Sequence, residues 1–215
     1  MSNVRMMKEI KVIKESKEMY IDMSDDNMKN FKIMFFGPPD SVFHNGVFVF
    51  EFNIPDGYPF EVPRVKFLTG GIVGARMHPN LYKEGKVCLS ILNTWGSNEW
   101  SPLLTIEKII LTIKGLLDNN PISHEPPYKS CDPHYNAYSL YYSMKSIPSV
   151  YSFYKNYNHP FASIILSHVK EQYEEILKKM EELKVHNKKS YRTIHHNEMI
   201  YSDYVNSSIM ELLKE

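Results

Sequence analysis

Cys88 lies in a segment whose residue types and spacing suit acyl transfer. It follows Gly85 by three residues, and Asn80 lies eight positions upstream of it in a polar His78-Pro79-Asn80 corner. A thiolate attacks activated acyl groups and forms a thioester, and a carboxamide N–H stabilises the oxyanion that forms when this thioester is attacked. The segment therefore predicts a displayed thiol with a carboxamide donor nearby.

A structural role for Cys88 is the alternative. Free cysteine is among the most buried residue types, and Cys88 stands in an apolar run between Val87 and Leu89. A lone cysteine shows no partner set, so by itself it is more often core than nucleophile. The wider pattern favours catalysis. His-Pro-Asn, seven residues, then Cys-Leu-x-Ile-Leu closely resembles the active-site signature of ubiquitin-conjugating enzymes, the E2 family.

The resemblance implies a role for each of these residues. Cys88 would accept ubiquitin or a ubiquitin-like modifier from the E1 activating enzyme as a thioester, and a lysine of a protein substrate or a cysteine of an E3 ligase would then take it. Asn80 would orient the active-site loop and support the oxyanion. His78, with Pro79 beside it, would hold the backbone of the loop. No metal or organic cofactor is implied, because ATP is consumed at E1.

The loop at 123–127 stands where small E2 enzymes carry an acidic gate beside the cysteine. Its polar group nearest the cleft is the hydroxyl of Ser123, the imidazole of His124 or the carboxylate of Glu125. Two prolines follow, and the position of Glu125 directly before Pro126 is equally compatible with an outward conformation. We expect Ser123 or His124 at the cleft, without choosing between them.

Two further stretches resemble E3-binding loops. Phe60 lies between two prolines that stiffen its loop, although an arbitrary phenylalanine is more often buried in a core. In the family, the equivalent phenylalanine acts together with a Ser-Pro loop after the active site, which here is Ser101-Pro102. Many members have alanine next, whereas this chain has Leu103, so the class of E3 stays open.

Residues 3–17 are predicted to form a helix with Val4, Met7, Ile10 and Ile13 facing the core. Basic residues recur every three positions on the same stretch. The first helix of E2 enzymes presents basic residues to E1, so the resemblance makes Arg5 and Lys8 the candidates. A solvated basic face is the alternative.

The remaining pattern predicts an α+β fold, and the resemblance implies that it is the ubiquitin-conjugating (UBC) fold. Residues 19–67 alternate apolar and polar side chains between turn signals, which indicates an antiparallel four-stranded meander sheet. A central helix from Leu104 to Asp118, with Thr105 as N-cap, is expected to pack across this sheet. The form CLSILxTW…WSP resembles the larger Z type of the family, and its Trp95 is either buried or a wall of the thioester cleft.

The domain organisation is predicted as a core at residues 3–157 with C-terminal helices. Two helical stretches, 135–145 and 149–157, are expected to be broken by Pro148. Residues 158–186 are expected to form one long amphipathic helix that docks on or extends the core. Residues 187–215 are expected to form a polar tail with a weak terminal helix.

Composition bounds the class of protein. The 215 residues are 43% apolar, and the 25 basic residues match the 25 acidic ones, so net charge gives no argument for nucleic acid or a membrane surface as partner. No segment reaches 18 uninterrupted apolar residues. Cys88 and Cys131 cannot make a disulfide framework, and a reactive thiol suits a reducing compartment. We expect a soluble cytoplasmic or nuclear protein.

The resemblance thus predicts an E2 enzyme. One alternative is a catalytically silent E2-like adaptor that only binds ubiquitin, a class that lacks the cysteine; the presence of Asn80 and Cys88 argues against it. The other is a sheet-and-helix adaptor without chemistry, in which the His-Pro-Asn corner is an accident. His195 and His196 do not make a metal site by spacing alone.

Overall fold

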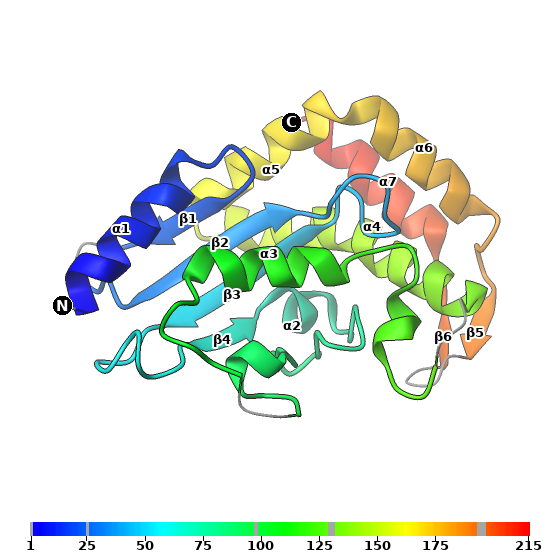
Figure 1. Cartoon of the computed structure of the whole chain (residues 1–215). Helices are drawn as coiled ribbons and strands as arrows, with labels where there is room; N and C mark the ends of the chain where they lie inside the picture. Colours follow the sequence, from blue (N-terminus) through cyan, green and yellow to red (C-terminus); the bar gives the residue numbers. More distant parts are fainter. Residues whose placement is uncertain (1, 25, 97–98, 129–131, 193–196) are drawn as a thin grey trace.

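A four-stranded antiparallel sheet organises the chain in a computed structural model that describes residues 2–24, 26–96, 99–128, 132–192 and 197–215. Its strands pair in sequence order, as predicted for a meander. Helices lie against the sheet from both sides, so the α+β prediction is confirmed (Figure 1). The strands are β1 (Tyr20–Met23), β2 (Asn30–Phe36), β3 (Val47–Asn53) and β4 (Arg64–Phe67).

One face of the sheet carries stacked phenylalanines. Phe31 of β2 stacks on Phe52 of β3 with ring centroids 5.5 Å apart, and Phe35 stacks on Phe48 and Phe50 at 5.7 Å. Helix α3 (Ile106–Leu116) crosses this face in Figure 1. As predicted, Thr105 caps α3 by accepting from the backbone N–H of Lys108, which satisfies one of the donors that a helix start leaves free. The aliphatic stripe of α3 is buried at Ile106, Ile109, Ile110 and Ile113.

The opposite face is also covered, which the alternation in the sequence does not predict. Met34 and Val49 point to this side and are fully buried. Helix α4 (Pro133–Lys155) reaches it through Ser146, whose hydroxyl accepts from the N–H of Val47 at 2.7 Å. Helix α5 (Pro160–Glu171) places His168 on Phe36 with ring centroids 3.5 Å apart. The chain after α3 therefore forms a second layer behind the sheet.

Helix α1 (Ser2–Glu15) has only part of the predicted apolar stripe on its buried side. Ile10 and Ile13 are buried as expected, but Val4 is 63% and Met7 41% exposed, and Met6 is buried instead. Steps of three residues drift by about 60° per step on a 3.6-residue helix, so the early members of the predicted row leave the core side.

A buried carboxylate fixes α1 to α3. Glu9 is 7% exposed and accepts from the Tyr58 hydroxyl at 2.7 Å and from the Ile106 N–H at 2.9 Å, while Arg5 pairs with it from the same helix. A negative charge at the first N–H groups of α3 is favourable because of the helix dipole. Burial, followed by the bond to Glu9, raises the pKa of Tyr58, so its hydroxyl stays a donor.

Helix α4 contradicts the predicted break at Pro148, because it runs unbroken through that residue. Proline removes one helical hydrogen bond and costs about 3 kcal/mol. Each large apolar side chain that becomes fully buried contributes about 1.5–3 kcal/mol. Several such residues on α4 outweigh the proline: Tyr135, Tyr138, Met144, Ile147 and Val150 are all 0% exposed.

The single helix predicted for residues 158–186 is also wrong. The chain forms α5 and then α6 (Tyr173–Lys184), and Gln172 between them has φ −100° and ψ 20°. Helix α5 packs on α4 with Phe161 and Ile165 buried, whereas α6 contacts α4 and α7. No proline or glycine marks this bend, so its cause is packing against different neighbours.

The last segment has more structure than a polar tail. Strand β5 (Ser190–Arg192) pairs antiparallel with β6 (Asn197–Met199), and helix α7 (Ser202–Leu212) packs on α4 and α6. The buried residues of α7 include Val205, Ile209 and Leu212, at helical spacing. Within the described part of the chain, none of the helices combines the length and apolar character that crossing a bilayer requires.

Candidate active site

The segment before Cys88 runs along the free edge of β4. The N–H of Phe67 donates to the Gly85 carbonyl at 2.8 Å, and Lys66 and Lys86 form an isolated bridge. Gly85 has φ +98°, and a Cβ there would lie 2.6 Å from Cγ of Lys66. Glycine alone suits this turn, which returns the chain from Asn80 to Cys88.

Cys88 is a free cysteine held close to the surface but covered. It is 5% exposed, and its Sγ donates to the Thr94 carbonyl at 3.6 Å. Its backbone N–H donates to the Asn80 carbonyl at 2.8 Å. The thiol thus lies beside Thr94 and is largely shielded from solvent.

Thr94 hydrogen-bonds to the backbone on either side of Cys88, and the sequence analysis did not identify it. Its Oγ1 accepts from the N–H of Leu89 at 2.9 Å and lies 2.6 Å from the Val87 carbonyl, to which it donates. The Thr-Trp pair in the CLSILxTW pattern was the available signal. The following residue, Trp95, is 52% exposed and therefore is not a core tryptophan.

The side chain of Asn80 hydrogen-bonds to the backbone of Cys88. Its Nδ2 donates to the Cys88 carbonyl at 2.7 Å, and its Oδ1 has no hydrogen-bond partner among the described residues. One N–H of the carboxamide thus fixes the loop, and the same group carries a second N–H.

His78 lies at the base of this corner. It is 0% exposed, and its Nδ1 accepts from the N–H of Asn80 at 3.0 Å. Burial, with the nearby His124 as the next cause, holds the pKa of His78 well below its usual range. A neutral imidazole that accepts at Nδ1 shapes the backbone of the corner and does not exchange protons near neutral pH.

Arg76 joins the corner to the gate loop, and sequence reasoning missed it. Its guanidinium donates to the Pro79 carbonyl, with Nε at 3.1 Å, and pairs with Oε2 of Glu125 at 2.9 Å. Its Cζ also lies 3.8 Å from the centre of the Tyr82 ring. Arg76 and Glu125 are 49 residues apart in the chain, so no local pattern reveals the pair.

The gate loop contains the short helix η2 (Pro121–His124), and each of its three polar candidates has an internal partner. Ser123 is exposed and donates to the Asn120 carbonyl at 2.7 Å. His124 pairs through Nε2 with Oδ2 of Asp118 at 3.0 Å, and its ring lies 5.3 Å from that of His78. Glu125 is paired with Arg76. Of the three gate residues, His124 therefore remains as the acid-base candidate beside the corner.

The two predicted E3-binding loops lie together. The indole N–H of Trp100 donates to the Pro59 carbonyl at 2.8 Å, which ties the Phe60 loop to the loop of Ser101 and Pro102. Phe60 is 80% exposed and Leu103 is 86% exposed, while Ser101 and Pro102 are half-buried. Phe60 therefore does not plug the core.

The two predicted E1-binding residues differ in their surroundings. Arg5 pairs with Glu9 and donates to the Leu104 carbonyl at 3.2 Å, so it holds α1 against the start of α3. Lys8 is exposed on α1. Cys131, His195 and His196 lie outside the described residues. Among the residues described, no group of three or more His, Cys, Asp or Glu side chains is arranged to hold a metal ion.

Comparisons with known proteins address the family. A family model described as ubiquitin-conjugating enzyme matches residues 5–146. Ubiquitin-conjugating enzyme E2 Z of Danio rerio is 38% identical over 111 residues, which cover 52% of this chain and 34% of that protein. E2 Z of Homo sapiens has the same identity and length of match, with 31% of that protein covered. The chain thus matches about a third of the length of these relatives.

Two further matches come from other organisms. Ubiquitin-conjugating enzyme E2 13 of Saccharomyces cerevisiae is 34% identical over 127 residues, covering 54% of this chain and 77% of that protein. A crystal structure of a ubiquitin conjugating enzyme E2 from Plasmodium falciparum matches with a TM-score of 0.47 and 27% identity, covering 54% of this chain and 97% of that one. The family model spans the sheet, α3 and the Cys88 segment, and by that match this chain belongs to the ubiquitin-conjugating enzyme family.

Proposed function

We propose that this protein is an active E2 enzyme that carries ubiquitin or a ubiquitin-like modifier as a thioester on Cys88. In the loading step, the Cys88 sulfur attacks the modifier's C-terminal carbonyl carbon, and the E1 cysteine leaves as a thiolate. In the discharge step, a substrate lysine amine forms an isopeptide bond and Cys88 leaves. With an E3 that has its own cysteine, that cysteine takes the acyl group first.

The arrangement of Asn80 and Cys88 carries this proposal. The two residues are joined through both backbone and side chain, by the Cys88 N–H to the Asn80 carbonyl and the Asn80 Nδ2 to the Cys88 carbonyl. These bonds keep the carboxamide beside the backbone of Cys88, which supports a role for its second N–H in stabilising the oxyanion. The general test incubates the full chain with a panel of E1 and modifier pairs and ATP, and resolves the products on non-reducing gels.

The low exposure of Cys88 favours a second candidate, a silent ubiquitin-binding adaptor. The active enzyme and the adaptor predict different outcomes in the adduct assay. An adaptor binds ubiquitin but forms no reductant-sensitive adduct with any E1 and modifier pair.

Lys8 is the proposed E1 contact on α1. We expect Lys8→Glu to slow E1 charging about fivefold, since an exposed charge contact contributes about 1 kcal/mol, and to leave discharge of a preloaded thioester unchanged. Single-turnover rates of the two steps, measured at low and high salt, check this, because salt screens exposed charges.

A matched control for Lys8 is Lys14→Glu, which makes the same charge change about 240° around the helix. Arg5→Glu is unsuitable, because it would set a second carboxylate against buried Glu9. Equal charging rates for Lys8→Glu, Lys14→Glu and the wild type at low salt would mean that this helix face is only solvated surface.

His124 is the proposed proton acceptor for the attacking lysine, with Asp118 holding its ring. A positioned base that takes a proton from the attacking group typically contributes about 10²–10⁴-fold, so loss of the imidazole should slow lysine discharge by a factor in this range. The measurement is single-turnover discharge to free lysine. His124→Ala should be slow in this assay, and Asp118→Asn should reduce the rate less.

Ser123→Ala and Glu125→Ala complete the comparison at the gate. Ser123→Ala should keep the wild-type rate. Slow discharge in Ser123→Ala alone would assign the gate to the hydroxyl. Slow discharge in Glu125→Ala with a normal rate in His124→Ala would indicate that the Arg76 pair, rather than His124, positions the amine.

A further inference from the structure

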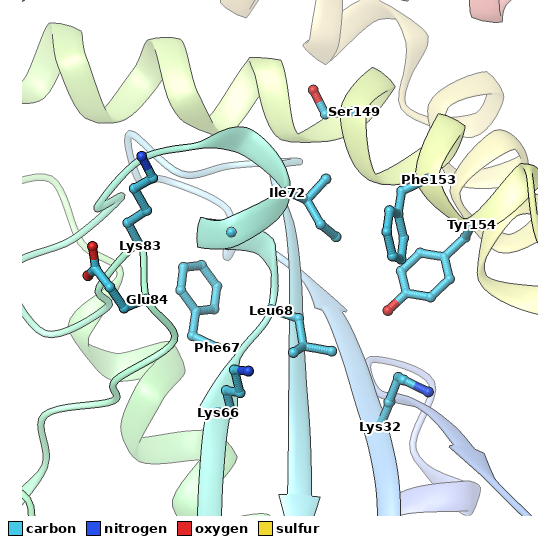
Figure 2. A pocket seen from close by; sticks show the side chains of 11 residues that line it. Lys32, Lys66, Phe67, Leu68, Ile72, Lys83, Glu84, Ser149, Phe153 and Tyr154 are labelled. Carbon is cyan, nitrogen blue, oxygen red and sulfur yellow. The ribbon is translucent and has the colours of Figure 1, made fainter.

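A cavity of about 690 Å³ lies behind the sheet, away from the thiol. Its walls come from β2 and β4, from the short helix α2 (Thr69–Val73), from the turn at residues 83–84 and from the second half of α4 (Figure 2). Pockets of roughly 300–1,000 Å³ are typical of small-molecule sites. Helix α4 adds one wall to this face of the sheet, and the result is an open cleft.

The middle of the cavity is apolar. Figure 2 shows Leu68 and Ile72 on one side and the ring of Phe153 on the other, with Phe67 between Leu68 and Glu84 in this view. Phe153 is 41% exposed although it is a large aromatic residue. An apolar group of a ligand placed between these side chains would remove apolar surface from water, which is favourable.

The rim of the cavity is cationic. Lys66 and Lys83 line it, and within the described ranges neither has a carboxylate at ion-pair distance. Lys32 pairs with Asp22 at 3.6 Å, Glu84 is the carboxylate in the lining, and Glu51 stands opposite Lys32 and Lys66 in the strand register. Lys66 and Lys83 are therefore the two cations of the rim left to receive an anion.

Tyr154 adds an unsatisfied donor. The residue is 3% exposed, and no described residue hydrogen-bonds its hydroxyl. In Figure 2 this hydroxyl is directed towards Leu68. A buried hydroxyl without a partner is unfavourable, so an acceptor atom of a ligand that reaches it would gain a hydrogen bond. Burial raises the pKa of Tyr154, so the group remains an O–H donor.

We propose that this cavity binds a small amphipathic organic acid, with its apolar body between Leu68, Ile72 and Phe153 and its anionic group at Lys66. The ligand class is an aromatic or medium-chain aliphatic acid. The site does not contain Cys88, so the proposal is independent of the proposed function.

The test uses 1-anilinonaphthalene-8-sulfonate, an aromatic anion, as a fluorescent probe of the full chain, with near-ultraviolet circular dichroism to show that the fold is intact. Octanoate should displace the probe, whereas octanol should need at least about tenfold higher concentration and octylamine should not compete. Phe153→Ala and Lys66→Gln should each weaken probe binding about tenfold. Cys88→Ala should bind the probe as the wild type does.

Two control variants change the same residue types elsewhere. Tyr204→Ala removes an aromatic that is 67% exposed on α7, and Lys178→Gln neutralises an exposed lysine on α6. Both should bind the probe normally. Equal binding by Phe153→Ala, Lys66→Gln and the controls would overturn the site. Equal displacement of the probe by octanol and octanoate would overturn the preference for an anion. If an acidic peptide displaced the probe and octanoate did not, the ligand would be a protein partner instead of a small acid.

Discussion

Cys88→Ala should abolish the reductant-sensitive adduct that the wild-type chain forms with E1, modifier and ATP. A thioester needs the sulfur, and alanine offers no nucleophile. Cys88→Ser gives a sharper result, because a serine oxygen that accepts the modifier forms an ester. That adduct should accumulate more slowly and survive reductant on the gel.

Cys131→Ala is the matched control, because it removes the other cysteine of the chain. It should form the normal amount of adduct. An adduct that persists in Cys88→Ala and disappears in Cys131→Ala would overturn the assignment of the nucleophile. Absence of an adduct in the wild type with every E1 and modifier pair would favour the silent adaptor.

Elements whose residues are near in sequence could be predicted. Helix α3 was predicted because its aliphatic stripe repeats at helical spacing and Thr105 supplies a cap. The corner from His78 to Cys88 was predicted because its residues form one short pattern. In both cases the sequence signal and the contacts lie within one short stretch of the chain.

Features that depend on distant residues could not be predicted. Glu9 lies among basic residues and exposed positions of α1, yet it is buried because Tyr58 and Ile106 supply donors from other parts of the chain. The pair of Arg76 and Glu125 has the same character. A charged residue that is buried by such partners looks, in the sequence alone, like an exposed one.

The second layer behind the sheet illustrates a different limit. Pro148 looks like a helix break when only local propensity is considered, and the bend at Gln172 has no local mark at all. Both are decided by burial of α4 and α5 against the sheet. Tertiary packing therefore overrode local propensity where the predictions for residues 135–186 were wrong.

Asn80→Ala should accept the modifier from E1 at a normal rate and discharge it to lysine about 10²–10³ times more slowly, since that is the usual effect of removing one oxyanion donor. The geometry offers a rival explanation. Asn80 also holds the Cys88 carbonyl at 2.7 Å, so the variant would loosen the loop as well as remove the donor.

Thr94→Val separates these two effects. It removes the hydroxyl that braces Val87 and Leu89 on either side of Cys88, but it leaves the Asn80 carboxamide in place. If the oxyanion is what Asn80 stabilises, single-turnover discharge should be slow in Asn80→Ala and near normal in Thr94→Val, with both folds intact by circular dichroism. Equal slowing of the two variants would make Asn80 a brace of the loop. Failure of Asn80→Ala to charge would instead place this residue in loading, because the loop would then be needed before any oxyanion from lysine attack has formed.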